Sequence, residues 1–376
     1  MNKINQLRNI LNQQNCDGYL IPKNDEYFGE YVPKNKDRLK FISGFTGSAG
    51  LALILKNKSY LFVDGRYTLQ AKAEINKNFE ICEIPKIKPH YILKNLNKKI
   101  TLGFDPKLFT SSTLKNIISN SLIKPKPINN NLIDIIWKNK KKINNNKFYI
   151  LEEKYHGENY LNKISKVCKF LKLKDIHYLL TTATENISWL LNIRGSDALY
   201  SPLTNGKILF NKNGKIIFFT NIKKITPQIK KAFKKKVIFI KEELFVNYLR
   251  KIKNSKILID KKTCSFYYEK NIHSSNKLID IEDPIYLLKA IKNKTEISNT
   301  KIAHLFDGIA LTKFIFWLKN NYKKTKITEL SAQNKLENYK KQNKNYLYPS
   351  CTCIDCFNHG SLFLSNKGMH SSEFMF

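Results

Sequence analysis

Hydrophobic residues recur along the chain at two spacings, one typical of helices and one typical of strands. The segment 3–15 carries Leu7, Ile10 and Leu11 on one side of a predicted helix, and a short apolar run follows within 16–22. Further apolar runs of strand length alternate with helical patterns over most of the chain. This alternation indicates an α/β fold.

The first set of elements ends at a linker-like stretch rich in lysine and asparagine, residues 138–147, so we predict a first domain over 1–140. A Ser-Ser-Thr start signal opens its last helix. Its other predicted elements are a hairpin from 51–55 to 60–75 that runs into a helix, and strands at 81–85 and 100–106.

A second set repeats the same logic, so we predict a second domain of similar build over 147–282. An Asn-Gly pair at its centre is a strong signal for a hairpin turn. Its predicted elements are helices at 155–176, 185–193, 225–234 and 243–252, strands at 177–183, 237–240 and 257–260, and a hairpin at 206–220.

The longest helical pattern lies at 283–318. Ile302, Leu305, Ile309 and Trp317 fall at spacings that place them on one helical face. Unless another part of the protein covers this face, we expect an exposed apolar patch that favours association.

Composition excludes several classes of protein. The chain has 376 residues, of which 42% are hydrophobic, as in globular proteins. No run approaches the roughly 18 apolar residues of a membrane span, and the amino terminus lacks the apolar core of a secretory signal. We therefore expect a cytoplasmic protein that does not contact a membrane.

The formal net charge of +36 raises the question of nucleic-acid binding. Only five of the 66 basic residues are arginine, whose bidentate fork usually reads phosphates and bases. The lysines are scattered along every segment, which favours solvated surface charge. We expect weak binding to polyanions and no specific nucleic-acid partner.

Two loop motifs contain candidate site residues. Asp64 and Arg66 flank a glycine at a predicted strand end, and Arg194 and Asp197 flank another between a helix and a loop. Each pair is a candidate either for ordering its loop or for lining a substrate cleft. The glycine-rich run at 44–50 lacks the spacing of a dinucleotide fingerprint, so we interpret it as a tight loop.

Four of the seven cysteines stand alone and are expected to be reduced and partly buried. The other three form a C-x-C-x2-C-x2-H pattern made by Cys351, Cys353, Cys356 and His359. Common zinc modules separate two ligand pairs by a dozen or so residues. We therefore favour an accidental thiol cluster over a zinc site.

Five segments together carry a resemblance to a known family. In chain order they are 18–50, 61–71, 184–197, 283–297 and 304–318, that is, GYLIPKNDEYFGEYVPKNKDRLKFISGFTGSAG, LFVDGRYTLQA, TENISWLLNIRGSD, DPIYLLKAIKNKTEI and HLFDGIALTKFIFWL. They resemble the long, three-domain form of Xaa-Pro aminopeptidase, or aminopeptidase P, of the creatinase/prolidase metallopeptidase group.

The resemblance implies two tandem creatinase-type α/β domains, at 1–140 and 147–282, and the start of a "pita-bread" peptidase domain at 283–350. In intact members it implies two divalent metals, usually manganese, held by two Asp, one His and two Glu. A hydroxide between such metals would attack the bond before proline in proline-containing peptides. A homodimer is also implied.

The sequence departs from the family pattern near its carboxyl end. Leu364 and Ser365 stand where a His-Tyr pair is expected, and beyond Glu337 the only carboxylates are Asp355 and Glu373. We therefore expect no catalytic residue, metal ligand or cofactor in this chain. We interpret 351–376 as an aberrant tail, and the chain as truncated within the catalytic domain.

The prediction is thus an Xaa-Pro aminopeptidase relative that is inactive alone. One alternative is a non-catalytic fragment that dimerises or pairs with a separately encoded catalytic half. A weaker alternative is a basic nucleic-acid binder.

Overall fold

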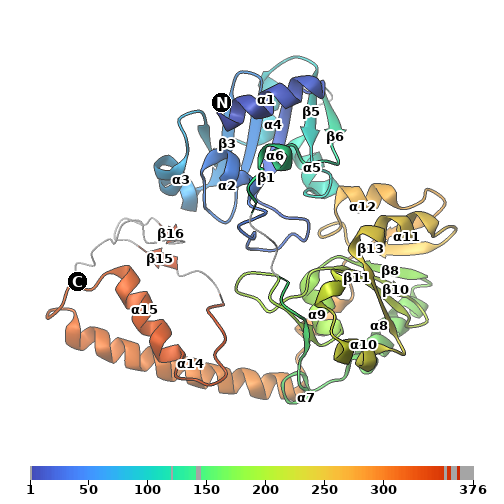
Figure 1. Ribbon diagram of the computed structural model, residues 1–376, viewed down its shortest axis with the longest axis vertical. Helices are drawn as coiled ribbons and strands as arrows, with labels where there is room; N and C mark the ends of the chain where they lie inside the picture. The colour runs from blue at the N-terminus through green and yellow to red at the C-terminus, as the bar shows by residue number, and fades with distance from the viewer. Residues whose placement is uncertain (1, 120–121, 141–144, 351–353, 357–361, 365–376) are drawn as a thin grey trace. The chain divides into compact units, whose positions relative to one another are not determined.

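The computed structural model describes residues 2–119, 122–140, 145–350, 354–356 and 362–364. The chain divides into two compact units. The first comprises Met1–Leu151 and Asn159–Ile291, and the second comprises Glu152–Glu158 and Lys292–Phe376. The first unit contains two six-stranded sheets, each with helices packed against it (Figure 1).

The first sheet has the strand order β4-β3-β2-β1-β5-β6. Strands β1, β2 and β3 pair antiparallel, and the remaining neighbours are parallel. The strands are β1 (Gly18–Pro22), β2 (Leu51–Leu55), β3 (Ser59–Asp64), β4 (Glu80–Ile84), β5 (Ile100–Phe104) and β6 (Ile123–Pro127).

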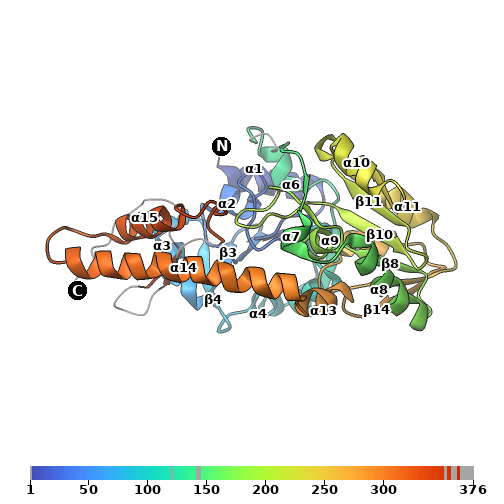
Figure 2. The same ribbon diagram turned by 90° about the horizontal axis from the view of Figure 1, so that it is seen from below.

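Helices cover both faces of this sheet. Figure 2 shows α1 and α6 on one side and α4 on the other. All five residues of the central strand β1 are buried, as expected for a strand between two helical layers. The helices are α1 (Lys3–Gln13), α2 (Arg38–Ser43), α3 (Thr68–Glu74), α4 (Pro89–Asn95), α5 (Ser111–Ile117) and α6 (Leu132–Ile136), with a 3-10 turn η1 (Gly65–Tyr67).

The second sheet has the order β12-β11-β10-β8-β13-β14 and repeats the pattern of parallel and antiparallel pairs. Helices α8, α9 and α10 pack on one face, and α11 and α12 on the other. Strands are β8 (Tyr178–Thr181), β10 (Lys207–Asn211), β11 (Ile216–Thr220), β12 (Val237–Lys241), β13 (Lys256–Ile259), β14 (Lys277–Asp280), and the short pair β7 (Tyr149–Ile150) and β9 (Ile193–Arg194). Helices are α8 (Tyr160–Leu173), α9 (Thr184–Leu190), α10 (Pro227–Phe233), α11 (Phe245–Lys251), α12 (Phe266–Asn271) and α13 (Ile285–Ala290), with turns η2 (Ile222–Lys224) and η3 (Glu242–Leu244).

The two sheets are therefore copies of one topology, as the repeated sequence pattern predicted. They are joined within the first unit by contacts at the start of α12. The backbone N–H groups of Phe266 and Tyr267 donate to the carbonyls of Phe109 and Pro106 at 2.7 and 2.9 Å. The Phe266 ring also packs edge-on against Phe104, with 5.5 Å between ring centres.

The second unit contains the long helix α14 (Lys294–Asn321), with α7 (Glu153–His156), α15 (Glu329–Lys340) and the strand pair β15 (Ile354–Cys356) and β16 (Leu362–Leu364). The prediction of one helix over 283–318 is wrong. The backbone turns extended at Ile291, and Asn293 begins a new helix through a reciprocal capping box with Glu296. Helix α13 belongs to the first unit instead.

The predicted apolar face of α14 is exposed. Ile302, Leu305 and Ile309 are 49%, 64% and 45% exposed. Because successive residues turn by about 100°, Leu311 and Ile315 lie on the opposite face, and they are also exposed. Apolar residues therefore lie on two faces of α14, whereas the sequence pattern had indicated one.

Candidate functional site

Asp64 and Arg66 form a self-contained pair at the end of β3. The Arg66 guanidinium donates to both carboxylate oxygens of Asp64, at 3.0 and 2.8 Å, and the Arg66 backbone N–H donates to the same carboxylate. These hydrogen bonds lower the pKa of Asp64. Both side chains are substantially exposed. The two-pronged contact needs arginine and orders the turn η1.

Arg194 and Asp197 lie at the start of the loop that leads from β9 to β10. Arg194 donates through Nη1 to the carbonyls of Ser188 and Ile193 at 2.6 and 3.1 Å. Asp197 forms an ion pair with Lys224 and accepts a hydrogen bond from the Asn205 N–H at 2.8 Å. The two charged groups of this ion pair are only 4% and 5% exposed. These contacts hold the loop in place, and a role in a substrate cleft stays a prediction.

A largely buried cluster that the sequence did not reveal joins the two domains of the first unit, with Lys207 at its centre. It consists of Tyr27, Lys207, Glu242 and Tyr268, and we call it the junction cluster. Lys207 is 1% exposed and forms an ion pair with Glu242, which also accepts a hydrogen bond from the Tyr27 hydroxyl at 2.7 Å. The Lys207 ammonium lies 4.4 Å from the ring centre of Tyr27 and 5.1 Å from that of Tyr268. A cation between two rings gains from both quadrupoles.

Electrostatics at the junction cluster are strongly coupled. Burial alone lowers the pKa of Lys207, but the Glu242 carboxylate outweighs that effect, and the pKa is raised. Burial raises the pKa of Glu242, and the attraction of Lys207 reverses this, so that its pKa is lowered. Both groups therefore stay charged across the neutral range.

The domain I side of the junction is a loop, residues 23–37, that a second charged network orders. The buried Arg38 guanidinium donates to Glu26 at 2.7 Å and to both oxygens of Asp134 at 2.8 and 2.9 Å. Lys36 adds an ion pair to Glu26. The loop thereby holds Tyr27 in place for the junction cluster.

Two bulky residues near the junction have left-handed backbone conformations. Phe28 has φ 55° in the domain I loop, and Tyr200 has φ 60° in the domain II loop. The Tyr200 ring contacts Tyr31 edge-on, with 4.9 Å between ring centres. Such conformations are costly for residues with a Cβ and cluster where structure is constrained by function. The aromatic and charged residues at 24–37 were the one signal of this site in the sequence.

A third polar cluster lies buried in the second domain, around Asp283. One oxygen of Asp283 accepts a hydrogen bond from the Ile285 N–H at 2.9 Å, and the other has no hydrogen-bond partner. The side chains of Thr181 and Asn186 lie close enough to this carboxyl to lower its pKa. Their own buried polar atoms also have no hydrogen-bond partner. Burial raises the pKa of Asp283 to about 6.

Asp283→Asn is expected to stabilise the protein above pH 6 and to have no effect below about pH 4. The folded-state pKa is raised, so the folded state binds more protons between these values, and stability falls as pH rises through them. A neutral amide removes this penalty, which is about 3 kcal/mol for a pKa raised from about 4 to about 6. Urea unfolding of both forms from pH 4 to 8 measures it, and a difference that does not vary with pH would contradict the assignment.

The described residues do not fit a two-metal centre. Within those ranges no three His, Cys, Asp or Glu side chains are placed to hold a metal ion. Cys351, Cys353 and His359 of the thiol motif, and the side chain of Cys356, lie outside what the structure describes. The cysteines Cys16, Cys82, Cys168 and Cys264 are free. None of the described helices has the length and apolar character needed to cross a bilayer.

Comparison with known proteins identifies both domains. Residues 3–131 and 139–296 each match the family of creatinase/prolidase N-terminal domains, and together they account for about three quarters of the chain. The chain therefore belongs to the group of proteins built on creatinase/prolidase N-terminal domains. Within that group it is similar over most of its length to Xaa-Pro aminopeptidases.

One curated relative is Xaa-Pro aminopeptidase 1 of Dictyostelium discoideum, 29% identical over 387 aligned residues. The alignment covers 97% of this chain and 61% of the relative. A solved structure, "X-prolyl aminopeptidase from Caenorhabditis elegans: a cytosolic enzyme with a di-nuclear active site", matches with a TM-score of 0.86 and 23% identity. The match covers 93% of this chain and 61% of the nematode chain. This similarity confirms the predicted fold class. The chain thus spans about three fifths of the length of each.

Proposed function

We propose that this chain forms the non-catalytic, amino-terminal part of an Xaa-Pro aminopeptidase, an enzyme that releases the residue preceding proline from a peptide amino terminus. The observation that carries the proposal is the pair of tandem creatinase/prolidase domains within a chain of which 97% aligns with 61% of one such enzyme. The junction cluster fits this role, because it fixes two non-catalytic domains to each other.

We also propose that the 376 residues do not hydrolyse peptides by themselves. Two bound metal ions would polarise the peptide carbonyl and supply a hydroxide in such an enzyme. The described residues provide no donor set for them, so we derive no hydrolytic step from this chain. Its residues act as a scaffold instead. By analogy with the nematode relative, which is described as cytosolic, we place the protein in the cytoplasm.

Two assays test the two halves of the proposal separately. The purified 376-residue chain, incubated with Mn²⁺ and a short peptide with proline in second position, should release no amino acid above a metal-only blank. Turnover that a chelator abolishes would overturn the inactivity. The native protein, captured from its source cells with an antibody against residues 1–291, should cleave the same peptide. Captured material without that activity would contradict the assignment to Xaa-Pro aminopeptidases.

A second candidate function is assembly into a homodimer through α14. The exposed Ile302, Leu305 and Ile309 on one face, and Leu311 and Ile315 on the other, favour it because large apolar patches usually mark interaction surfaces. Light scattering should then give twice the 44.0 kDa chain mass, and the variant Leu305→Glu should give the mass of a single chain. A monomer at all concentrations would remove this candidate.

A further inference from the structure

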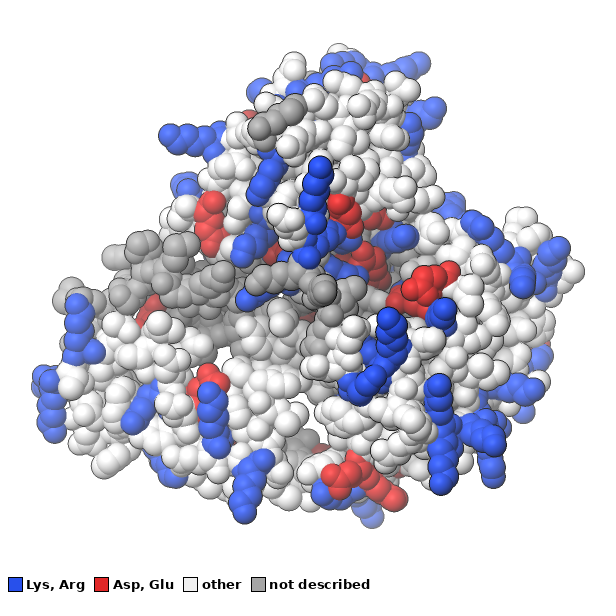
Figure 3. Space-filling model, viewed as in Figure 1, with Lys and Arg blue, Asp and Glu red and all other residues white. Residues whose placement is uncertain are grey.

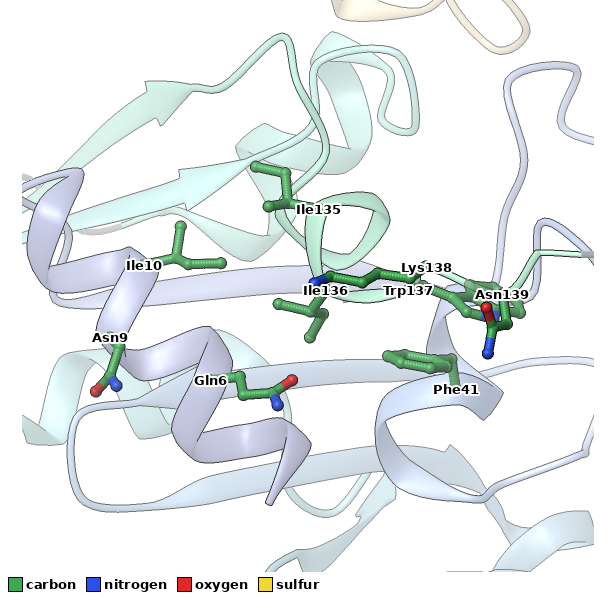
Figure 4. Close-up of a pocket in the computed structure, with 9 residues that line it drawn as sticks. All are labelled: Gln6, Asn9, Ile10, Phe41, Ile135, Ile136, Trp137, Lys138 and Asn139. Atoms are coloured by element: carbon green, nitrogen blue, oxygen red, sulfur yellow. The ribbon is translucent and has the colours of Figure 1, made fainter. Parts of the chain in front are cut away.

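An open groove on the first domain lies between α1, α2 and α6 (Figure 4), and none of its lining residues belongs to the junction cluster. Its volume is about 590 Å³. Apolar side chains form most of its lining, and amides and one lysine complete it. The lining residues are Ile10, Phe41, Ile135, Ile136 and Trp137, with Gln6, Asn9, Asn139 and Lys138. Ile135 is 50% exposed in the groove, which leaves an apolar strip in contact with water.

The aromatic part of the groove is held rigid by stacking. Phe41 and Trp137 stack with 4.8 Å between ring centres and an angle of 16°. The Lys3 ammonium lies 4.3 Å from the centre of Phe41, and the Lys140 ammonium lies 5.1 Å from that of Trp137. Each ring therefore has a ring on one side and a cation over it. Because no ring face is left for a base, the groove does not suit the stacking by which nucleic acids are bound.

The charge around the groove is positive and largely uncompensated. Helix α1 contains no acidic residue. Asp134, the only carboxylate of α6, is already engaged by Arg38 and Lys140. Lys3 donates one hydrogen bond to the Phe41 carbonyl and keeps further donors, and Lys138 is exposed beside the groove.

We propose that this groove is a docking site for an acidic segment of a partner protein. Apolar side chains of the partner would cover Ile10, Ile135 and Ile136, and its carboxylates would meet Lys138 and Lys3. A second copy of this chain is a poor occupant of this groove because the groove's lysines call for carboxylates, and the chain has 30 acidic residues against 66 basic ones. On the face shown in Figure 3, basic side chains occur at many separate places, so charge alone would not direct a partner to one of them. The apolar strip supplies the selectivity.

The site requires no catalysis and is independent of the proposed enzymatic role. One wall of the groove, residues 137–139, includes the first two residues of the linker between the two domains. An occupant would therefore hold the start of that linker against α1.

A labelled peptide of about twelve residues, made of alternating leucine and glutamate pairs, tests the proposal by fluorescence anisotropy with the full chain. We expect saturable binding, with a Kd on the order of tens of micromolar. Ile135→Asp and Lys138→Glu should each weaken it about tenfold or more. Both changes are at exposed positions and should leave the fold intact, which circular dichroism checks.

The matched control is Leu173→Asp, because Leu173 is 77% exposed on α8 of the other domain. The affinity of the Leu173→Asp variant for the leucine–glutamate peptide should equal that of the unmodified chain. A second peptide with serine in place of leucine separates docking from non-specific attraction to lysine. Equal binding of both peptides, equal weakening by Leu173→Asp, or no binding at all would each overturn the proposal.

Discussion

Glu242→Gln is expected to lower the free energy of unfolding of the first unit by about 3 kcal/mol at pH 7. Glutamine keeps the shape of the side chain and still accepts the Tyr27 hydroxyl, but it removes the negative charge that faces Lys207. Lys207 is 1% exposed, so its ammonium would stay buried without a counter-ion. Urea unfolding followed by circular dichroism measures the loss.

The pH dependence of this loss has a definite sign. The folded-state pKa of Lys207 is raised, so the pair stabilises the protein fully below the ordinary lysine value of about 10.4. The difference between the two forms should therefore be constant from pH 6 to 9 and should shrink as pH rises further. The double variant Lys207→Met, Glu242→Gln should recover most of the stability, because methionine places no charge between the two tyrosine rings.

Asp175→Asn is the matched control. Asp175 also forms an ion pair with a lysine, Lys256, but both side chains are exposed to water. Exposed pairs contribute little to stability, so this variant should have the same free energy of unfolding as the unmodified chain. An equal loss in Glu242→Gln and Asp175→Asn would mean that burial of the junction cluster has no special importance.

The repeated fold could be predicted because its central strands are buried. Apolar runs such as Leu51–Leu55 and Ile216–Thr220 are strand-length and nearly uninterrupted. The edge strands β6 and β14 were missed. The strand Ile123–Pro127 contains two prolines, which edge strands tolerate, and its exposed residues dilute the apolar pattern. The strand Lys277–Asp280 is similarly polar.

The junction cluster could not be predicted for a different reason. Tyr27 and Glu242 are 215 residues apart, and only the packing of the two domains brings them together. Lys207 is one of many lysines, and no local pattern distinguishes the buried one from those in solvent. The Asp64–Arg66 pair could be proposed from sequence because its partners are two residues apart. Sequence thus reveals contacts that are local and hides those that depend on tertiary structure.

Asp197→Asn is expected to destabilise the second domain by about 3 kcal/mol. The asparagine side-chain oxygen can still accept the hydrogen bond from the Asn205 N–H, but the negative charge that faces Lys224 is lost. The Lys224 side chain is only 5% exposed. A buried ammonium without a counter-ion is among the most costly defects in a folded domain. Thermal and urea unfolding of the variant measure the loss.

This prediction separates the two roles that the sequence left open for Asp197. If Asp197 orders the loop, adding Lys224→Met to Asp197→Asn should restore most of the lost stability, because the loss comes from the buried Lys224 ammonium without a counter-ion. The exposed pair of Lys262 and Glu282 supplies the control, and Glu282→Gln should leave unfolding unchanged. If Asp197→Asn is as stable as the unmodified chain, Asp197 does not order the loop, and its buried charge is then best explained as part of a substrate cleft.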